Sequence, residues 1–254
     1  MKQGLNKLVL LLMLQNVCCG VAFSQVIEVH TPIYDSTLLH SGRFNAAIAG
    51  ITELDFSSVR STLLAMQPDI TYYPEAQQAQ YWYYLAVSAW QLGFSSDKVI
   101  PNIEKTLTFS DSLEDYELFQ ILMNAKDMAR DYVHFHHAIN YIERIKQLVG
   151  ERPDTNGLLL PSPVDADYAI AHHQIGENNK AISYLNSLIS LTEMAGDKPV
   201  RYWFQVLSSA QVITGDIAGA IKTTKKQINI YPHRNSDMHL EYLELLHNQQ
   251  AKLL

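Results

Sequence analysis

The chain has 254 residues, of which 47% are hydrophobic and 18% are charged, a composition typical of a well-packed protein and not of a disordered one. Its formal net charge is −7, from 19 basic and 26 acidic residues. This negative balance argues against nucleic acid or an anionic membrane surface as the partner.

The first residues have the features of a secretory signal peptide. Lys2 and Lys7 precede the apolar run LVLLLML at positions 8–14, and small residues then lead to Ser24. The run is too short to span a bilayer, which disfavours a retained anchor. We therefore expect residues 1–24 to be cleaved after Ser24, with export to the periplasm and no stable membrane insertion afterwards.

Both cysteines, Cys18 and Cys19, lie in the segment that would be removed. The mature chain would then have no disulfide and no Cys-ligated metal site, so core packing must hold it together. Its formal charge would be −9, which favours a basic segment as the partner.

Residues 25–35 are predicted to form an N-terminal arm, and residues 36–254 a single all-α domain. In the first hairpin, helical apolar spacing begins at Ser36 and continues through residues 55–67, which Pro68 ends. The second hairpin pairs QYWYYLAVSAWQLG at 80–93 with a helix near 97–109.

The third hairpin is expected to start at a capping box, DSLE at 111–114, with a first helix to about Ala129 and a second over about 133–148. The turn-rich stretch 150–163 is interpreted as a bridge between two parts of one array. The fourth hairpin follows, with Tyr168, Ala169, His172, Gly176, Ala181, Leu185 and Leu188 as its marker positions.

The fifth hairpin, residues 199–232, is the most complete one. Gly215 marks its turn, Ala220 the close approach of its helices, and Pro232 its end. Ser236 is expected to cap a last helix, MHLEYLELLHNQQAKLL, at 238–254.

These hairpins resemble tetratricopeptide repeats. In the second, large residues at Trp82 and Leu85, small ones at Ala86 and Ala89, and a turn at Gly93 follow the family spacing. The resemblance implies a right-handed α-solenoid of about five hairpins with a C-terminal capping helix.

The second helix of each hairpin should carry a small residue where it crosses the first. Ala138, Ala181 and Ala220 fit that position, whereas Lys98 or Val99 occupies it in the second hairpin. Counted from Val99, these positions are 39, 43 and 39 residues apart, so the repeats are longer than the usual ~34 residues.

The resemblance also implies which residues face a partner, because ligand-facing positions of the family lie on the first helix of each hairpin. Carried over by the turn glycines, the partner-binding residues are Gln80, Tyr83, Val87, Trp90, Gln91, His173, Gln174, Tyr202, Gln205 and Ser209. The alternative for Tyr83 and Trp90 is packing between repeats, where aromatics at helical spacing are common.

Histidines are the strongest candidates for chemistry. His134, His136 and His137 form the string HFHH, and His134 and His137 share a helical face. Without cysteine, an HExxH motif or a defined third ligand, we interpret them as packed or solvated and assign no metal, although metal binding by this cluster stays open. The chain also lacks a GxSxG elbow and any spaced acid–base pair, so we expect no catalytic residue, no cofactor and no enzyme activity.

The string over residues 167–232 resembles the periplasmic tetratricopeptide proteins that accompany TonB energy-transduction systems. Shared features are a lengthened second helix, the pair Tyr202-Trp203 opening the next hairpin, and the closing Tyr231-Pro232. The resemblance implies an exported scaffold that binds protein or peptide partners as an accessory of TonB-dependent uptake. The alternatives are a general cell-envelope assembly or secretion scaffold, and a metal-handling periplasmic protein that uses the histidines.

Overall fold

The computed structural model describes residues 44, 47, 49–51, 53–150, 162–232 and 234–251. The predicted signal peptide at 1–24 and the predicted arm at 25–35 lie outside the described residues. The chain divides into two compact units, one formed by residues 30–181 and one that includes residues 182–254. The boundary falls inside the helix at 178–194, and each unit is described by itself.

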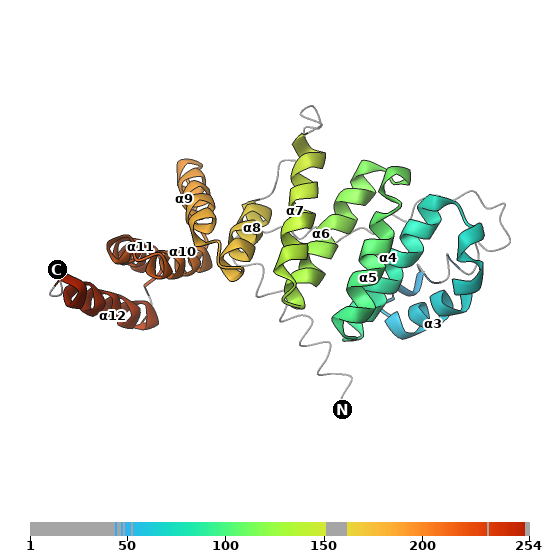
Figure 1. Ribbon diagram of the computed structural model, residues 1–254, viewed down its shortest axis with the longest axis horizontal. Coiled ribbons are helices and arrows are strands. Elements are labelled where there is room, and N and C mark those ends of the chain that lie inside the picture. Colours follow the sequence, from blue (N-terminus) through green and yellow to red (C-terminus); the bar gives the residue numbers. More distant parts are fainter. Residues whose placement is uncertain are drawn as a thin grey trace. The chain divides into compact units, whose positions relative to one another are not determined.

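The described residues form α-helices and two short 3₁₀ helices, with no strand among them (Figure 1). In chain order the elements are α3 (Phe56–Met66), η1 (Gln67–Tyr72), α4 (Glu75–Gln91), α5 (Ser96–Leu107), η2 (Ser110–Ser112), α6 (Asp115–Asp131), α7 (Phe135–Gly150), α8 (Ser162–Gln174), α9 (Asn178–Met194), α10 (Arg201–Ile213), α11 (Ile217–Ile230) and α12 (Arg234–Ala251). The predicted all-α fold is confirmed. In this part of the chain, no helix is both long and apolar enough to cross a bilayer.

Four helix pairs share one turn geometry. The residue two positions after the end of the first helix has a left-handed backbone at Gly93, Val133, Gly176 and Gly215, with φ of 73°, 63°, 85° and 84°. Glycine adopts this conformation without steric cost, whereas the β-branched Val133 does not. The four positions recur every 39 to 43 residues, which supports the long repeat expected from the sequence.

The small positions of the second helices are buried as predicted. Ala138, Ala181 and Ala220 are at most 3% exposed. In α5, Val99 is fully buried and Lys98 is exposed, so Val99 takes the position that the sequence left open between them.

Two predicted helix starts are wrong. The chain at Ser110–Ser112 forms η2, and α6 begins only at Asp115, with Glu114 as its N-cap and Glu117 completing a capping box. Leu113 lies between them in an extended conformation and is buried, which separates the turn from the helix.

Ser236 does not cap the last helix, because α12 begins at Arg234 and already contains it. The Ser236 side chain is buried, and its Oγ accepts a hydrogen bond of 2.9 Å from Gln227 Nε2. The serine therefore joins α12 to α11 instead of starting the helix.

The most buried aromatic rings of α4 are not that of Trp82, the large residue marked by the family spacing. Tyr81 is fully buried and Tyr84 is 8% exposed, whereas Trp82 is only partly buried at the edge of the core. Leu85 is buried as predicted. The rings of Tyr81 and Trp82 meet edge to face, 5.0 Å apart.

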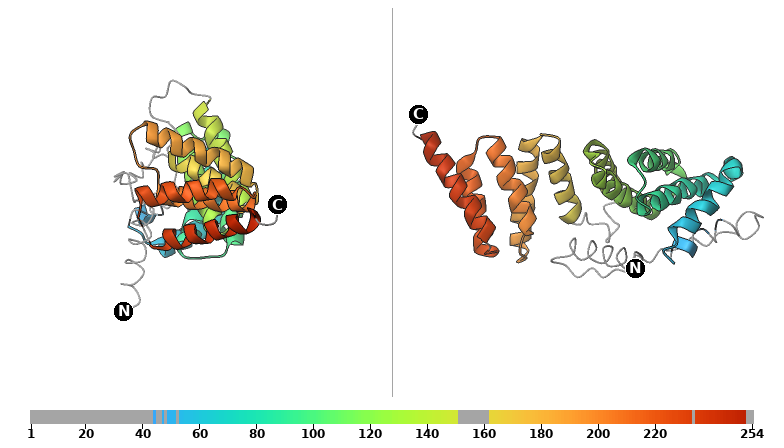
Figure 2. Two further views of the ribbon diagram at one scale, coloured as in Figure 1. Left: turned by 90° about the vertical axis from the view of Figure 1, so that its left-hand side faces the viewer. Right: turned by 90° about the horizontal axis from the view of Figure 1, so that it is seen from below.

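In the unit after residue 181, α10, α11 and α12 lie side by side (Figure 2). Ser208 Oγ and Thr224 Oγ1 are hydrogen-bonded at 3.1 Å between α10 and α11, and Gln227 reaches Ser236 between α11 and α12. Because α11 runs antiparallel to both neighbours, α10 and α12 run parallel. The fully or nearly buried core of these helices includes Trp203, Phe204, Leu207, Ala220 and Leu243.

Candidate functional site

Among the described residues, two surfaces contain side chains that were predicted to bind a partner, one surface in each unit. In the unit of residues 30–181, two predicted binding residues of α4 are hydrogen-bonded to α6. Gln80 is 4% exposed and its Nε2 donates to Glu117 Oε1 at 3.1 Å, while Tyr83 Oη accepts from Asn124 Nδ2 at 2.6 Å. Burial raises the pKa of the Tyr83 phenol well above its ordinary value. These contacts favour the packing alternative for Tyr83.

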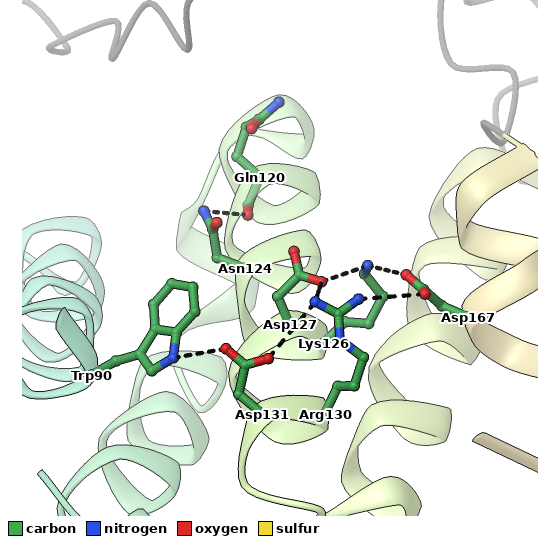
Figure 3. A network of polar contacts seen from close by, with 8 residues as sticks. All are labelled: Trp90, Gln120, Asn124, Lys126, Asp127, Arg130, Asp131 and Asp167. Atoms are coloured by element: carbon green, nitrogen blue, oxygen red, sulfur yellow. Dashed lines mark hydrogen bonds and ion pairs between the residues drawn. The ribbon is translucent and has the colours of Figure 1, made fainter. Parts of the chain in front are cut away.

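Trp90 also reaches the next first helix. Its indole Nε1 donates to Asp131 Oδ2 at 3.2 Å, and Asp131 Oδ1 lies 3.7 Å from Arg130 Nη2 (Figure 3). Trp90 is half-buried and Asp131 is exposed, so this end of the network is open to solvent.

The network continues into the interior at Lys126, whose side chain is only 4% exposed. Its Nζ lies 2.8 Å from Asp127 Oδ1 and forms an ion pair with Asp167 of α8, which Arg130 also contacts (Figure 3). Burial disfavours the ammonium, but Asp167 and Asp127 outweigh it and raise the pKa of Lys126 above its ordinary value. The lysine is therefore charged at neutral pH and joins α6 to α8.

Lys126 stands where other hairpins have small residues. Seven positions before the turn residue, the other first helices carry Ala86, Ala169 and Ser208, all at most 1% exposed. The polar residues of α6 were not predicted from the sequence, because its turn residue is Val133, whereas the other hairpins were aligned by their turn glycines. The available signal was that Val133 precedes Ala138 by five residues, as Gly176 precedes Ala181 and Gly215 precedes Ala220.

Among the described contacts, none joins the other predicted binding residues of this unit to the network. Val87 and His173 are half-buried, and Gln91 and Gln174 are exposed. His173 Nδ1 lies 2.6 Å from Asn178 Oδ1 at the turn into α9.

His172 is 2% exposed and belongs to the fold's interior. Its Nδ1 is 2.7 Å from Glu177 Oε2, and its ring meets that of Tyr168 edge to face at 4.4 Å. Burial lowers the pKa of His172, although Glu177 acts in the opposite direction.

The HFHH histidines gain no third metal ligand in the described part of the chain. The rings of His134 and His137 are 5.9 Å apart, and His137 Nδ1 is 3.3 Å from Glu104 Oε1. Among the described residues, no three His, Cys, Asp or Glu side chains lie where they could hold a metal ion together.

The second surface is a groove of about 350 Å³ between α10 and α12. α10 lines it with Arg201, Gln205, Ser209, Val212 and Ile213, and α11 contributes Gln227. α12 lines it with Asn235, Ser236, His239 and Tyr242. The structure thus places two predicted binding residues, Gln205 and Ser209, in one groove, whereas the predicted Tyr202 is 49% exposed but does not line it.

The four α12 residues of the groove were not predicted to bind a partner, because that helix was expected to be a C-terminal cap. The spacing of Asn235, His239 and Tyr242 places them on one helical face, which was the available signal.

No family model matches the chain, and no curated protein matches it. Solved structures do. The apo form of RapI superposes with a TM-score of 0.55 at 11% identity over 82% of this chain and 76% of RapI. YrrB, described as a TPR protein with an unusual peptide-binding site, superposes with a TM-score of 0.57 at 13% identity over 79% of this chain and 90% of YrrB.

A putative kinesin light chain from Podospora anserina, with nearly identical TPR-like repeats, matches with a TM-score of 0.54 at 12% identity, over 75% of this chain and 94% of that one. The chain has the tetratricopeptide-repeat fold. In this tetratricopeptide array, the groove lies between the first helix of one hairpin, α10, and the helix that follows that hairpin, α12.

Proposed function

We propose that this protein is an exported, non-enzymatic scaffold that binds protein or peptide partners in the groove between α10 and α12. The observation that carries the proposal is the lining of that groove. Gln205 offers an amide group that can pair with a peptide backbone, and Ile213 and Tyr242 offer apolar contact area. YrrB, which has the same fold, is described by its peptide-binding site.

The test compares two side chains of α12 with equal exposure. Tyr242 and Leu245 are each 58% exposed, but only Tyr242 lines the groove. Tyr242→Ala should weaken partner binding at least about tenfold if the ring is a hot spot, and Leu245→Ala should change it less than about twofold. Equal losses from the two variants, with unchanged melting, would remove the groove from the proposal.

The proposed location is the periplasm, and the proposed setting is a TonB-dependent uptake system. The leader features of residues 1–24 support export, and Tyr202-Trp203 with Tyr231-Pro232 support the TonB setting. Intact mass of the exported protein should correspond to a start near Gln25. An uncleaved chain retained in the inner membrane would contradict export.

Identifying the partner separates the two scaffold roles. Photo-crosslinking from the Gln205 position in intact cells should trap a TonB-system component if the protein is an uptake accessory. Trapping an assembly or secretion component instead would favour the general envelope scaffold. Stoichiometric Zn²⁺ binding that is abolished by His134→Ala would favour the metal-handling alternative.

A further inference from the structure

The groove between α10 and α12 has a charge of its own that the net charge of the chain conceals. Residues 30–181 contain 10 Lys and Arg against 19 Asp and Glu, whereas residues 182–254 contain 7 against 6. Within the described residues, Arg201 is the one Lys or Arg that lines the groove, and no carboxylate lines it. The acidic balance of the whole chain, which favours a basic partner, therefore does not apply here.

Arg201 lines the groove and is partly exposed. It is the first residue of α10 and forms no ion pair with the described residues, and its Nε is buried without a hydrogen-bond partner among them. A guanidinium in this state gains most from a carboxylate, which can accept two parallel N–H donors. An amide or hydroxyl of a ligand would supply a weaker, uncharged acceptor.

The opposite end of the groove is apolar. Val212 and Ile213 end its α10 wall, and Tyr242 lies on α12, with Ile213 63% and Tyr242 58% exposed. Arg201 and Ile213 are separated by the length of α10, about 18 Å at 1.5 Å per residue. An extended peptide covers that distance with five or six residues, at about 3.3 Å each.

Resting on the proposed function, we propose that the groove binds an extended segment with an acidic side chain at Arg201 and a large apolar side chain over Ile213 and Tyr242. The two side chains are about four or six residues apart, because alternate residues of an extended chain point the same way. The proposed carboxylate is that of an internal Glu or Asp side chain. Gln205 and His239 lie between the two ends of the groove, where the proposed peptide backbone would pass.

The experiment measures fluorescence anisotropy with synthetic peptides of about ten residues, acetylated and amidated so that neither terminus is charged. Glu and Phe stand four or six residues apart, in both orders, in a Ser and Gly background. Each peptide has a twin with Gln in place of Glu. The proteins are the mature chain, Arg201→Gln and the control Leu245→Ala.

We expect at least one Glu peptide to bind the parent about fivefold or more tightly than its Gln twin, and this preference to disappear in Arg201→Gln but persist in Leu245→Ala. Added salt should reduce the preference. Equal binding of the twins, no binding of any Glu peptide, or tighter binding of a Gln peptide with a free carboxyl terminus would overturn the proposal. If the twins bind equally and Tyr242→Ala weakens both, the scaffold function stands and only the acidic preference fails.

Discussion

Removal of the Asp167 carboxylate tests whether the buried ion pair really joins α6 to α8. Lys126 is 4% exposed and would keep only Asp127, whose own side chain is 32% exposed. A buried charge left wholly unpaired costs about 3–5 kcal/mol, so with one partner remaining we expect Asp167→Ala to lower the free energy of unfolding by about 2–3 kcal/mol. Arg130 loses a longer contact at 3.4 Å from a side chain that is 37% exposed, which adds little.

The decisive variant adds Lys126→Met to Asp167→Ala. Methionine keeps the volume of the lysine stem and removes the buried charge, so the double variant should be about 1 kcal/mol more stable than Asp167→Ala alone. Urea unfolding followed by tryptophan fluorescence measures both. With Trp203→Phe in every protein, the signal comes from Trp82 and Trp90, which belong to the same unit as the ion pair.

A second ion pair provides the control. Lys146 of α7 and Asp165 of α8 form an ion pair at 3.1 Å, but their side chains are 27% and 34% exposed. The same pair of substitutions there should couple by no more than about 0.5 kcal/mol. Equal coupling energies at the two ion pairs would show that the charge of Lys126 is not buried. A further loss of stability when Lys126→Met is added to Asp167→Ala would show the same.

Four further predictions concern single residues. Val133→Gly should raise the free energy of unfolding by about 0.5–1 kcal/mol in thermal melts, because it removes a β-branched residue from a left-handed backbone conformation. Gly93→Val should lower it by about 1–2 kcal/mol, although no atom lies within 4 Å of the added Cβ. Burial lowers the pKa of His172, so the unfolded chain binds the imidazole proton more tightly than the folded one. The free energy of unfolding should therefore fall as the pH drops below about 6.5. His172→Gln should make this fall smaller, as measured by urea midpoints at each pH. Ala220→Trp should cost about 1–3 kcal/mol or more by overpacking, and a parent-like melting temperature would show that α11 does not pack there. Tyr83→Phe should cost about 1 kcal/mol without weakening partner capture, and the reverse pattern would place its hydroxyl against a partner.

The helices, their turns and their close-approach positions were predictable from the sequence. Gly215 and Ala220 specify a turn and a helix crossing through properties of the residues themselves, namely a backbone without Cβ strain and a side chain that leaves room. Apolar spacing likewise predicted a helix over residues 55–67, where Val59 and Leu63 are buried, because helical periodicity is a property of neighbouring residues. Where valine replaces the turn glycine, at Val133, no partner-facing position was predicted on the first helix of that hairpin, α6.

Only the tertiary structure decided which first-helix residues remain available to a partner. Tyr83 and Gln205 each lie ten positions before the turn glycine of their hairpin, yet Tyr83 is hydrogen-bonded by Asn124 of the next first helix, while Gln205 lines an open groove. Likewise, Lys126 is a surface residue by type and becomes interior because Asp167, 41 residues later, neutralises it. The physical reason is that these outcomes depend on how far one hairpin rotates against the next, and contacts between residues about 40 positions apart leave no trace in local periodicity.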